Sequence, residues 1–214
     1  MAAIRRGFDT QIAARHLGRV DPMFKPWIRK LGPIEAPISW RGAFDPTDAL
    51  ARAILHQQLS GKAAATIIGR LEAASGVSVI SGSAISSLSD SELRACGISG
   101  NKAKALRDLA ARAVRGEIPS SRKLAHMSED DIISVLTEVR GIGRWTVEML
   151  LMFRLGRPDV LPVDDLGIRK GAQRLDVLES LVSPRELSSR GEIWGPYRSL
   201  AAMYLWRIAD FSGE

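Results

Sequence analysis

The chain has 214 residues, of which 30 are Lys or Arg and 24 are Asp or Glu, for a formal net charge of +6. Its hydrophobic fraction of 45% is enough to build a buried core, and no low-complexity tract indicates disorder. The single cysteine, Cys96, excludes an intrachain disulfide and any iron–sulfur or zinc site built from several thiolates, and it suits a reducing cytoplasm. Every apolar run is far shorter than the roughly 20 residues that span a bilayer, so we expect no transmembrane helix. The basic N-terminus lacks the apolar run of a secretory signal, so we expect no export.

Positive charge is concentrated in two segments. Residues 1–30 and 97–123 each contain seven Lys or Arg and only two Asp or Glu. Clustered cations suit a polyphosphate partner such as nucleic acid, although a solvated helix face explains the charge pattern equally well.

Helix start signals recur along the chain, whereas strand signals are scarce. Asp45 is followed by a proline and a first-turn acid, which predicts a helix with Asp45 as its N-cap. Capping boxes, in which a serine precedes an acid by three residues, predict further helices after Ser89, Ser128 and Ser183. Residues 77–80 are the best strand candidate, but no second run nearby could pair with them. We therefore predict an all-α protein.

Residues 139–146 read Val-Arg-Gly-Ile-Gly-Arg-Trp-Thr and precede the mostly apolar run 147–153. The pattern predicts a helix, a tight hairpin and a second helix. Gly141 and Gly143 allow backbone conformations closed to other residues and leave the amides of the second helix open to a phosphate. A plain helical hairpin that ends in a glycine C-cap is the alternative that these glycines alone leave open.

The hairpin, followed by Leu161-Pro162-Val163-Asp164-Asp165, resembles the helix-hairpin-helix (HhH-GPD) DNA glycosylases, and most of all the AlkA-type 3-methyladenine glycosylases in a compact form. Asp165 follows Trp145 by 20 residues, which matches the family signature, while Leu161 stands where the family usually has Met or Phe. The resemblance implies that Asp165 is catalytic. Asp164 remains the alternative, and we assign helix N-capping mainly to Asp164.

A second block, Trp-Gly-Pro-Tyr-Arg-Ser at 194–199 followed by 201–206, is similar to the C-terminal part of AlkA-type enzymes. It implies that Trp206 lines the pocket for the base, together with Trp145 and Met149 from the helix after the hairpin. A plain core position is the alternative for Trp206.

A third block, residues 54–64, resembles the loop that fills the hole left by an extruded base. The alignment gives this role to Gln58, with Gln57 and Leu59 as alternatives. The chemistry of the block is equally consistent with an exposed polar helix end capped by Ser60.

The resemblance also implies how the hairpin meets DNA. The residues implied to contact the DNA backbone there are Gly141, Gly143, Arg144 and Thr146. A monovalent cation, Na⁺ or K⁺, is implied at the backbone carbonyls of Thr137, Val139 and Ile142, and no cofactor is required for the reaction.

The resemblance implies a monofunctional enzyme. Bifunctional relatives carry a catalytic lysine where this chain has Trp145, and an indole forms no Schiff base. The implied reaction is hydrolytic release of alkylated purines, of the 3-methyladenine and 7-methylguanine type, from double-stranded DNA at the start of base excision repair. We expect a monomer in the bacterial cytoplasm or the eukaryotic nucleus. A glycosylase for other damaged bases and a non-catalytic damage-binding protein remain the alternatives.

The resemblance covers roughly residues 10–210 of what we expect to be a single domain, residues 1–214. We expect two helical lobes, 46–154 and 1–45 with 155–214, and a DNA cleft between them.

Overall fold

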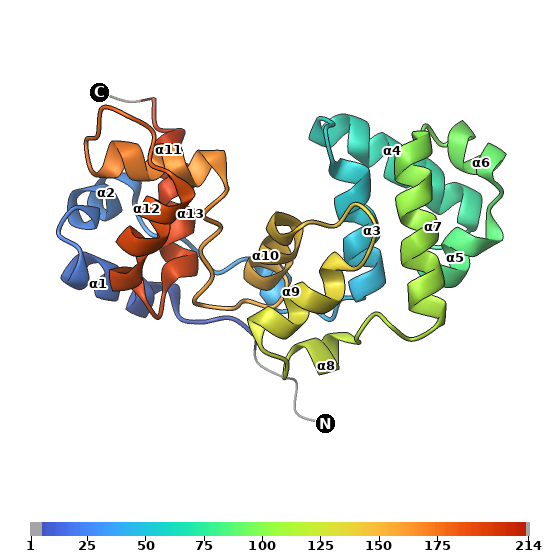
Figure 1. The fold of residues 1–214 in the computed structure, drawn as a ribbon, viewed down its shortest axis with the longest axis horizontal. Coiled ribbons are helices and arrows are strands. Elements are labelled where there is room, and N and C mark those ends of the chain that lie inside the picture. The colour runs from blue at the N-terminus through green and yellow to red at the C-terminus, as the bar shows by residue number, and fades with distance from the viewer. Residues whose placement is uncertain (1–5, 213–214) are drawn as a thin grey trace. The chain divides into compact units, whose positions relative to one another are not determined.

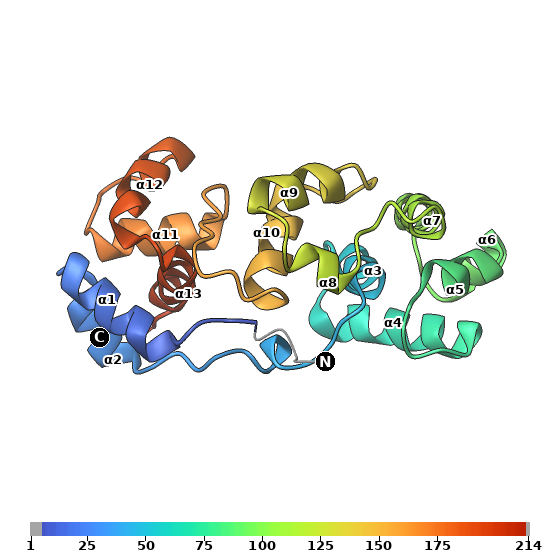
Figure 2. The same ribbon diagram turned by 90° about the horizontal axis from the view of Figure 1, so that it is seen from below.

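The computed structural model describes residues 6–212, and within them it contains α-helices, two short 3-10 helices and no strand (Figures 1 and 2). The all-α prediction is confirmed. Arg5, in the N-terminal basic segment, lies outside the described residues.

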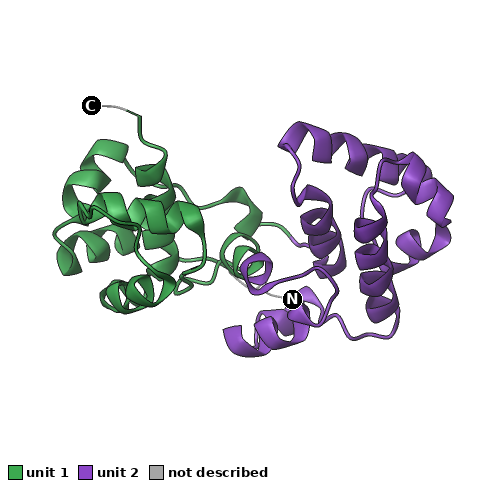
Figure 3. Ribbon diagram, turned by 45° about the horizontal axis from the view of Figure 1, so that its top comes forward, with its two compact units in different colours: residues 1–42, 148–214 green, residues 43–147 purple. Residues whose placement is uncertain are grey.

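Contacts divide the chain into two compact units (Figure 3). The first contains the described parts of residues 1–42 and 148–214, and the second contains residues 43–147. We predicted that the central lobe would begin at residue 46 and end at residue 154, three and seven residues later than the second unit begins and ends. The second unit ends within α10 (Arg144–Phe153), which passes from one unit into the other.

The first unit is built around α13 (Arg198–Ala209), whose residues from Ser199 to Leu205 are all buried. Its other helices are α1 (Thr10–Val20), α2 (Phe24–Leu31), η1 (Ile38–Trp40), α11 (Leu166–Leu175), α12 (Pro184–Arg190) and η2 (Gly191–Trp194). Helix α11 lies directly against α13 (Figures 1 and 2). A Cβ at Gly171 would lie only 2.0 Å from the carbonyl oxygen of Leu205, so the absence of a side chain there sets how closely the two helices pack.

Side chains from η1 donate hydrogen bonds to carbonyl groups at the C-terminal end of α10. Trp40 Nε1 donates to the carbonyl of Met152 at 2.8 Å, and Ser39 Oγ donates to the carbonyl of Phe153 at 2.5 Å. The last carbonyls of a helix have no intrahelical donor, so these bonds satisfy groups that would otherwise be orphaned. They also fix the position of Phe153.

The second unit contains a succession of short and medium helices that lead into the start of α10. They are α3 (Pro46–His56), α4 (Gly61–Ser75), α5 (Gly82–Ser87), α6 (Asp90–Ala95), α7 (Gly100–Val114), α8 (Ser121–Leu124) and α9 (Glu129–Thr137). Helix α7 packs against both α3 and α5.

The predicted helix starts are confirmed. Asp45, Ser89, Ser128 and Ser183 are all N-caps whose side chains accept a hydrogen bond from the first turn. At Ser89 and Ser183 the third helical residue is Glu, and its carboxylate in turn accepts a hydrogen bond from the backbone N–H of the serine. At Ser128 the shorter Asp131 side chain instead accepts a hydrogen bond from the serine hydroxyl at 2.7 Å.

The strand candidate, residues 77–80, is irregular, because side chains of α3 form hydrogen bonds with its backbone groups. Asp48 accepts the N–H of Ile80 at 2.9 Å, and Arg52 donates to the carbonyl of Ser78 at 2.9 Å. Backbone groups bonded to side chains in this way are not available for a ladder.

Candidate active site and DNA-binding elements

In the first unit, Asp165 is the N-cap of α11. Its Oδ1 accepts hydrogen bonds from the backbone N–H of Ile168 and from Trp206 Nε1, both at 2.8 Å. Our assignment of the cap to Asp164 is therefore wrong. The helix begins at Leu166, so Asp165 takes the cap position while Asp164 is exposed. Capping holds the carboxylate in one orientation and is compatible with a catalytic role.

Trp206 is half-buried on α13 and is held on more than one side. Its ring stacks on Phe153, with centroids 5.9 Å apart and planes 26° apart. Gly167 lies against its edge, where a Cβ would be 2.8 Å from Trp206 Cδ1 and 3.1 Å from Asp165 Oδ1. The missing side chain of Gly167 thus allows the indole to reach the carboxylate.

Sequence reasoning did not find Phe153 and Gly167. Phe153 ends an apolar run and looks like an ordinary core residue. The only signal in the sequence was the position of Gly167, in the first turn after Asp165, because glycine lowers the stability of a helix.

The other two predicted pocket residues lie on α10. Met149 is half-buried within the first unit, and Trp145 is 48% exposed within the second unit. The structure therefore brings Asp165 and Trp206 into direct contact, and the pocket roles of Met149 and Trp145 stay predictions.

In the second unit, residues 138–143 form the predicted hairpin between α9 and α10. Gly141 has φ +78°, a left-handed conformation that favours glycine. Gly143 has no positive φ, so the conformational freedom that both glycines allow is used in this way at Gly141 and not at Gly143. A Cβ at Gly143 would meet open space, which leaves the start of α10 accessible.

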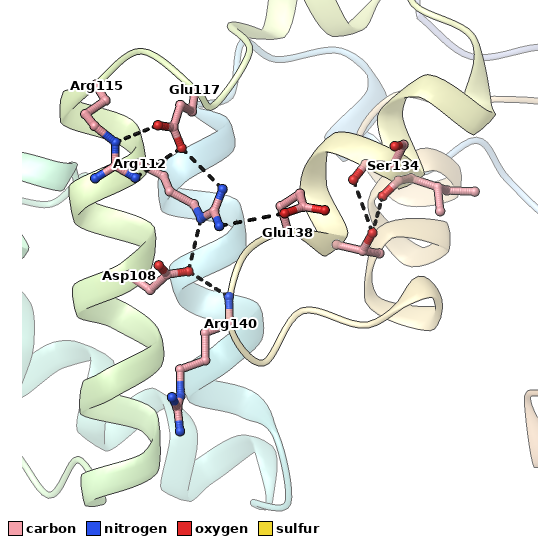
Figure 4. A network of polar contacts seen from close by, with 9 residues as sticks. Asp108, Arg112, Arg115, Glu117, Ser134, Glu138 and Arg140 are labelled. Atoms are coloured by element: carbon pink, nitrogen blue, oxygen red, sulfur yellow. Dashed lines mark hydrogen bonds and ion pairs between the residues drawn. The ribbon is translucent and has the colours of Figure 1, made fainter.

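Two side chains from elsewhere in the second unit hold the hairpin. Asp108 Oδ2 accepts the N–H of Arg140 at 2.8 Å (Figure 4), and Gln57 Nε2 donates to the carbonyl of Gly141 at 2.8 Å. The turn is thereby fixed to both α7 and the end of α3. A fixed turn presents its amides to an anion without first having to be ordered.

The remaining hairpin candidates differ in accessibility. Arg144 is exposed at the start of α10, whereas Thr146 is only 9% exposed and its N–H donates to the carbonyl of Gly143 at 3.0 Å. Arg144 suits a phosphate contact, and the burial of Thr146 does not favour one.

The loop of residues 57–60, between α3 and α4, has one residue in an unusual conformation. Gln58 is exposed with φ +57°, which few non-glycine residues adopt. Gln57 is half-buried and bonded to the hairpin, and Leu59 is 39% exposed. Lys102 donates to the carbonyl of Leu55 at 2.8 Å just before the loop, and burial lowers the pKa of this lysine.

The carbonyls implied to hold a cation are at the end of α9 and in the hairpin. That of Val139 accepts the N–H of Ile142 at 3.0 Å, and a second lone pair remains for a metal ion. Backbone carbonyls and the negative end of a helix dipole both suit a monovalent cation, so Thr137, Val139 and Ile142 fit the group. Among the described residues no cluster of His, Cys, Asp and Glu could hold a metal ion.

Together, a helix-hairpin-helix element and a helix-capping aspartate bonded to a tryptophan are the parts expected of a helical DNA glycosylase. Residues 51–196 match the HhH-GPD superfamily base excision DNA repair protein model. The chain belongs to this superfamily. Within residues 6–212, no helix is both long and apolar enough to cross a membrane.

The chain is also similar to individual 3-methyladenine glycosylases of this superfamily. It is 35% identical over 201 residues to DNA-3-methyladenine glycosylase 1 of Schizosaccharomyces pombe, covering 92% of this chain and 88% of the relative. The structure of an S. pombe 3-methyladenine DNA glycosylase in complex with abasic DNA matches with a TM-score of 0.81 and 34% identity, covering 94% of this chain and 98% of that one. That of a Bacillus halodurans DNA-3-methyladenine glycosidase matches with a TM-score of 0.83 and 32% identity, covering 92% and 89%.

Proposed function

We propose that the protein is a monofunctional DNA glycosylase that releases alkylated purines, of the 3-methyladenine and 7-methylguanine type, from double-stranded DNA by hydrolysis. It would thereby begin base excision repair, as a monomer, in the cytoplasm of a bacterium or the nucleus of a eukaryote. The observation that carries the proposal is the fixed carboxylate of Asp165, whose Oδ1 accepts hydrogen bonds from Ile168 and Trp206.

The chemistry follows from the charge of the substrate. Alkylation at N3 or N7 makes the purine cationic, so it leaves with little help from a general acid. As the bond between C1′ and the base nitrogen breaks, positive charge develops on the sugar. A carboxylate already held in place stabilises that charge without reorganising during the reaction. Water then adds at C1′, its proton is lost, and an abasic strand remains.

Aromatic side chains suit a cationic base. Trp145 and Trp206 would offer π faces to it, an interaction worth roughly 0.5–2 kcal/mol. This is enough to favour alkylated over normal purines and too little to supply the whole rate enhancement.

The DNA-binding roles rest on exposure and geometry. Gly143 and the first turn of α10 would receive a backbone phosphate, with Gly141 shaping the turn and Arg144 adding charge. Gln58 would fill the space left by the extruded base, because it is exposed at the tip of its loop while the side chain of Gln57 is bonded to the hairpin.

A Na⁺ or K⁺ ion would be held by the carbonyls of Thr137, Val139 and Ile142. Its chemistry would be electrostatic, since a cation in the hairpin attracts the neighbouring DNA phosphate.

The decisive experiment incubates the protein with duplexes that each contain one defined lesion and measures the released base, together with strand cleavage before and after alkali. We expect release of 3-methyladenine and 7-methylguanine with cleavage only after alkali. Release of an oxidised or mismatched base alone would identify a different glycosylase, and binding without release would identify a damage-binding protein. A covalent complex trapped by borohydride would contradict the monofunctional mechanism.

A further inference from the structure

A hollow of about 480 Å³ lies on the second unit, bordered by α6, α7 and the hairpin. Five cationic and three acidic side chains line it, which gives it a formal net charge of +2. None of these residues has a role in the proposed reaction. We call this feature the basic hollow.

The three acids of the basic hollow all lie beside two of its arginines, Arg107 and Arg112. Asp90 pairs with Arg107 at 2.9 Å. Asp108 pairs with Arg112 at 3.2 Å, and Glu138 lies 3.9 Å from the same guanidinium (Figure 4). Two cationic charges face three acidic ones in these pairs, and Arg112 also pairs with Glu117 at 3.2 Å. The other three cations outweigh this local excess of −1, so the hollow as a whole keeps its formal net charge of +2.

Three cations of the hollow remain, namely Arg94, Lys104 and Arg140. Their side chains are exposed, and none of them forms an ion pair or hydrogen bond with another residue of the part of the chain described here. In Figure 4 the backbone nitrogen of Arg140 meets Asp108 while its guanidinium points away from that network. Three such charges around one hollow create a local positive potential that attracts an anion.

The basic hollow adjoins the hairpin. Arg140 directly precedes Gly141, and a Cβ at Gly141 would lie 3.4 Å from the Cβ of Ala105 on α7, one residue after Lys104. Successive phosphates of one strand are about 3.4 Å apart along the duplex axis. A backbone that meets the hairpin can therefore reach the hollow within a few nucleotides.

We propose that the basic hollow binds phosphodiester groups of the duplex beyond the phosphate at the hairpin. Arg94 and Arg140 supply planar donors that match phosphate oxygens, and Lys104 supplies a point charge. The choice of DNA over a free anion rests on the proposed function. The hollow would extend the length of DNA backbone that the protein contacts, without contributing to sequence recognition.

The test compares wild type with the triple variant Arg94→Gln/Lys104→Gln/Arg140→Gln. A matched control, Arg41→Gln/Arg70→Gln/Arg185→Gln, removes the same charge from exposed side chains outside both basic segments, at the end of η1, on α4 and on α12. Binding to undamaged duplex is measured by fluorescence anisotropy across a salt series. Base release is not needed, so failure of the glycosylase assay would leave this test intact.

We expect the triple variant to bind a long duplex about tenfold more weakly. Its log–log salt slope should be lower by about 1 to 3, at about 0.9 for each phosphate that the variant no longer neutralises. The control should retain the wild-type slope. Equal affinities and slopes in the two variants would overturn the proposal. The single variant Arg140→Gln, whose side chain has no partner to lose, repeats the comparison should the triple variant fold poorly.

Two further arms separate DNA from a free anion. The first arm uses a duplex with one abasic-site analogue, which fixes where the protein binds. Shortening that duplex on one side of the site should abolish the difference between wild type and the triple variant, whereas shortening it on the other side should preserve it. Replacing chloride by inorganic phosphate at equal ionic strength should leave that difference unchanged. A difference that survives both truncations, or that phosphate alone removes, would mean that the hollow binds a free anion and would overturn the proposal.

Discussion

The indole N–H of Trp206 donates to the same oxygen of Asp165 that caps α11. One carboxylate oxygen is therefore fixed by two helices at once, and the rotation of the carboxylate is set by the packing of α11 on α13. Substitutions around Asp165 should therefore affect mainly base release, whereas substitutions in the hairpin should affect mainly DNA binding.

Asp165→Asn should abolish base release and leave DNA binding at or above the wild-type level. The amide oxygen of Asn still accepts the bonds from Ile168 and Trp206, so the fold is kept while the charge is lost. Single-turnover release and anisotropy measure the two effects. Asp164→Asn is the control and should remain within a few-fold of wild type; the reverse ranking would move catalysis to Asp164.

Trp206→Phe should slow single-turnover base release about tenfold, because a hydrogen bond to a charged group contributes about 1.5–3 kcal/mol and the phenyl ring has no donor. Stacking on Phe153 is retained, so the melting temperature should change little. Trp27→Phe, on α2, is the matched control. Equal rates in the two variants would show that the indole N–H does not orient Asp165.

Gly167→Ala should reduce base release, because the added methyl group would lie 2.8 Å from Trp206 Cδ1 and push the indole away from Asp165. Gly69→Ala, in α4, is the control: its methyl group meets open space and should stabilise the fold by about 0.5–1 kcal/mol. Rates and urea unfolding are measured for both variants. A fully active Gly167→Ala enzyme would contradict the proposed packing.

Gly143→Val should weaken binding to damaged and undamaged duplex alike, and should lower the log–log salt slope by about 0.9 for each phosphate that the hairpin no longer binds. Its side chain meets open space in the free protein, so circular dichroism should show a normal fold. Gly141→Val, at φ +78°, should instead lower the melting temperature. Unchanged binding by a folded Gly143→Val protein would make the hairpin a purely structural turn.

Asp159→Asn should destabilise the first unit by about 1 kcal/mol at neutral pH, a value reduced for solvent screening because the pair is partly exposed. Hydrogen bonds from Arg198 lower the pKa of Asp159, so its contribution is complete above the ordinary aspartate pKa and is lost as pH falls through the lower folded value. Urea unfolding should show wild type and variant converging below about pH 4. A gap that persists at low pH would exclude an ionic contribution.

Helix starts were predictable because a cap is a local device, formed by a hydroxyl or carboxylate and an amide three residues on. The choice between Asp164 and Asp165 as cap was not, since it depends on a one-residue difference in where α11 begins. Phe153 and Gly167 escaped prediction for another reason. Their roles depend on contacts with Trp206, which is far from both in sequence.

The hairpin shows the same division. The two glycines of the hairpin and its place between two helices could be predicted from the sequence. The sequence also showed that Trp145 stands where bifunctional relatives have a catalytic lysine. The bond from Arg140 to Asp108 spans 32 residues, and no local pattern indicates it.

The bond from Gln57 to the carbonyl of Gly141 has a consequence for the search for damage. It ties the residue before Gln58 to the turn proposed to hold the DNA backbone, so it helps to fix the position of the loop relative to the hairpin. If the hairpin holds the DNA backbone and Gln58 fills the space of an extruded base, as proposed, Gln58 would already be placed against the bound strand, and no separate closure of the loop would be needed to inspect a base.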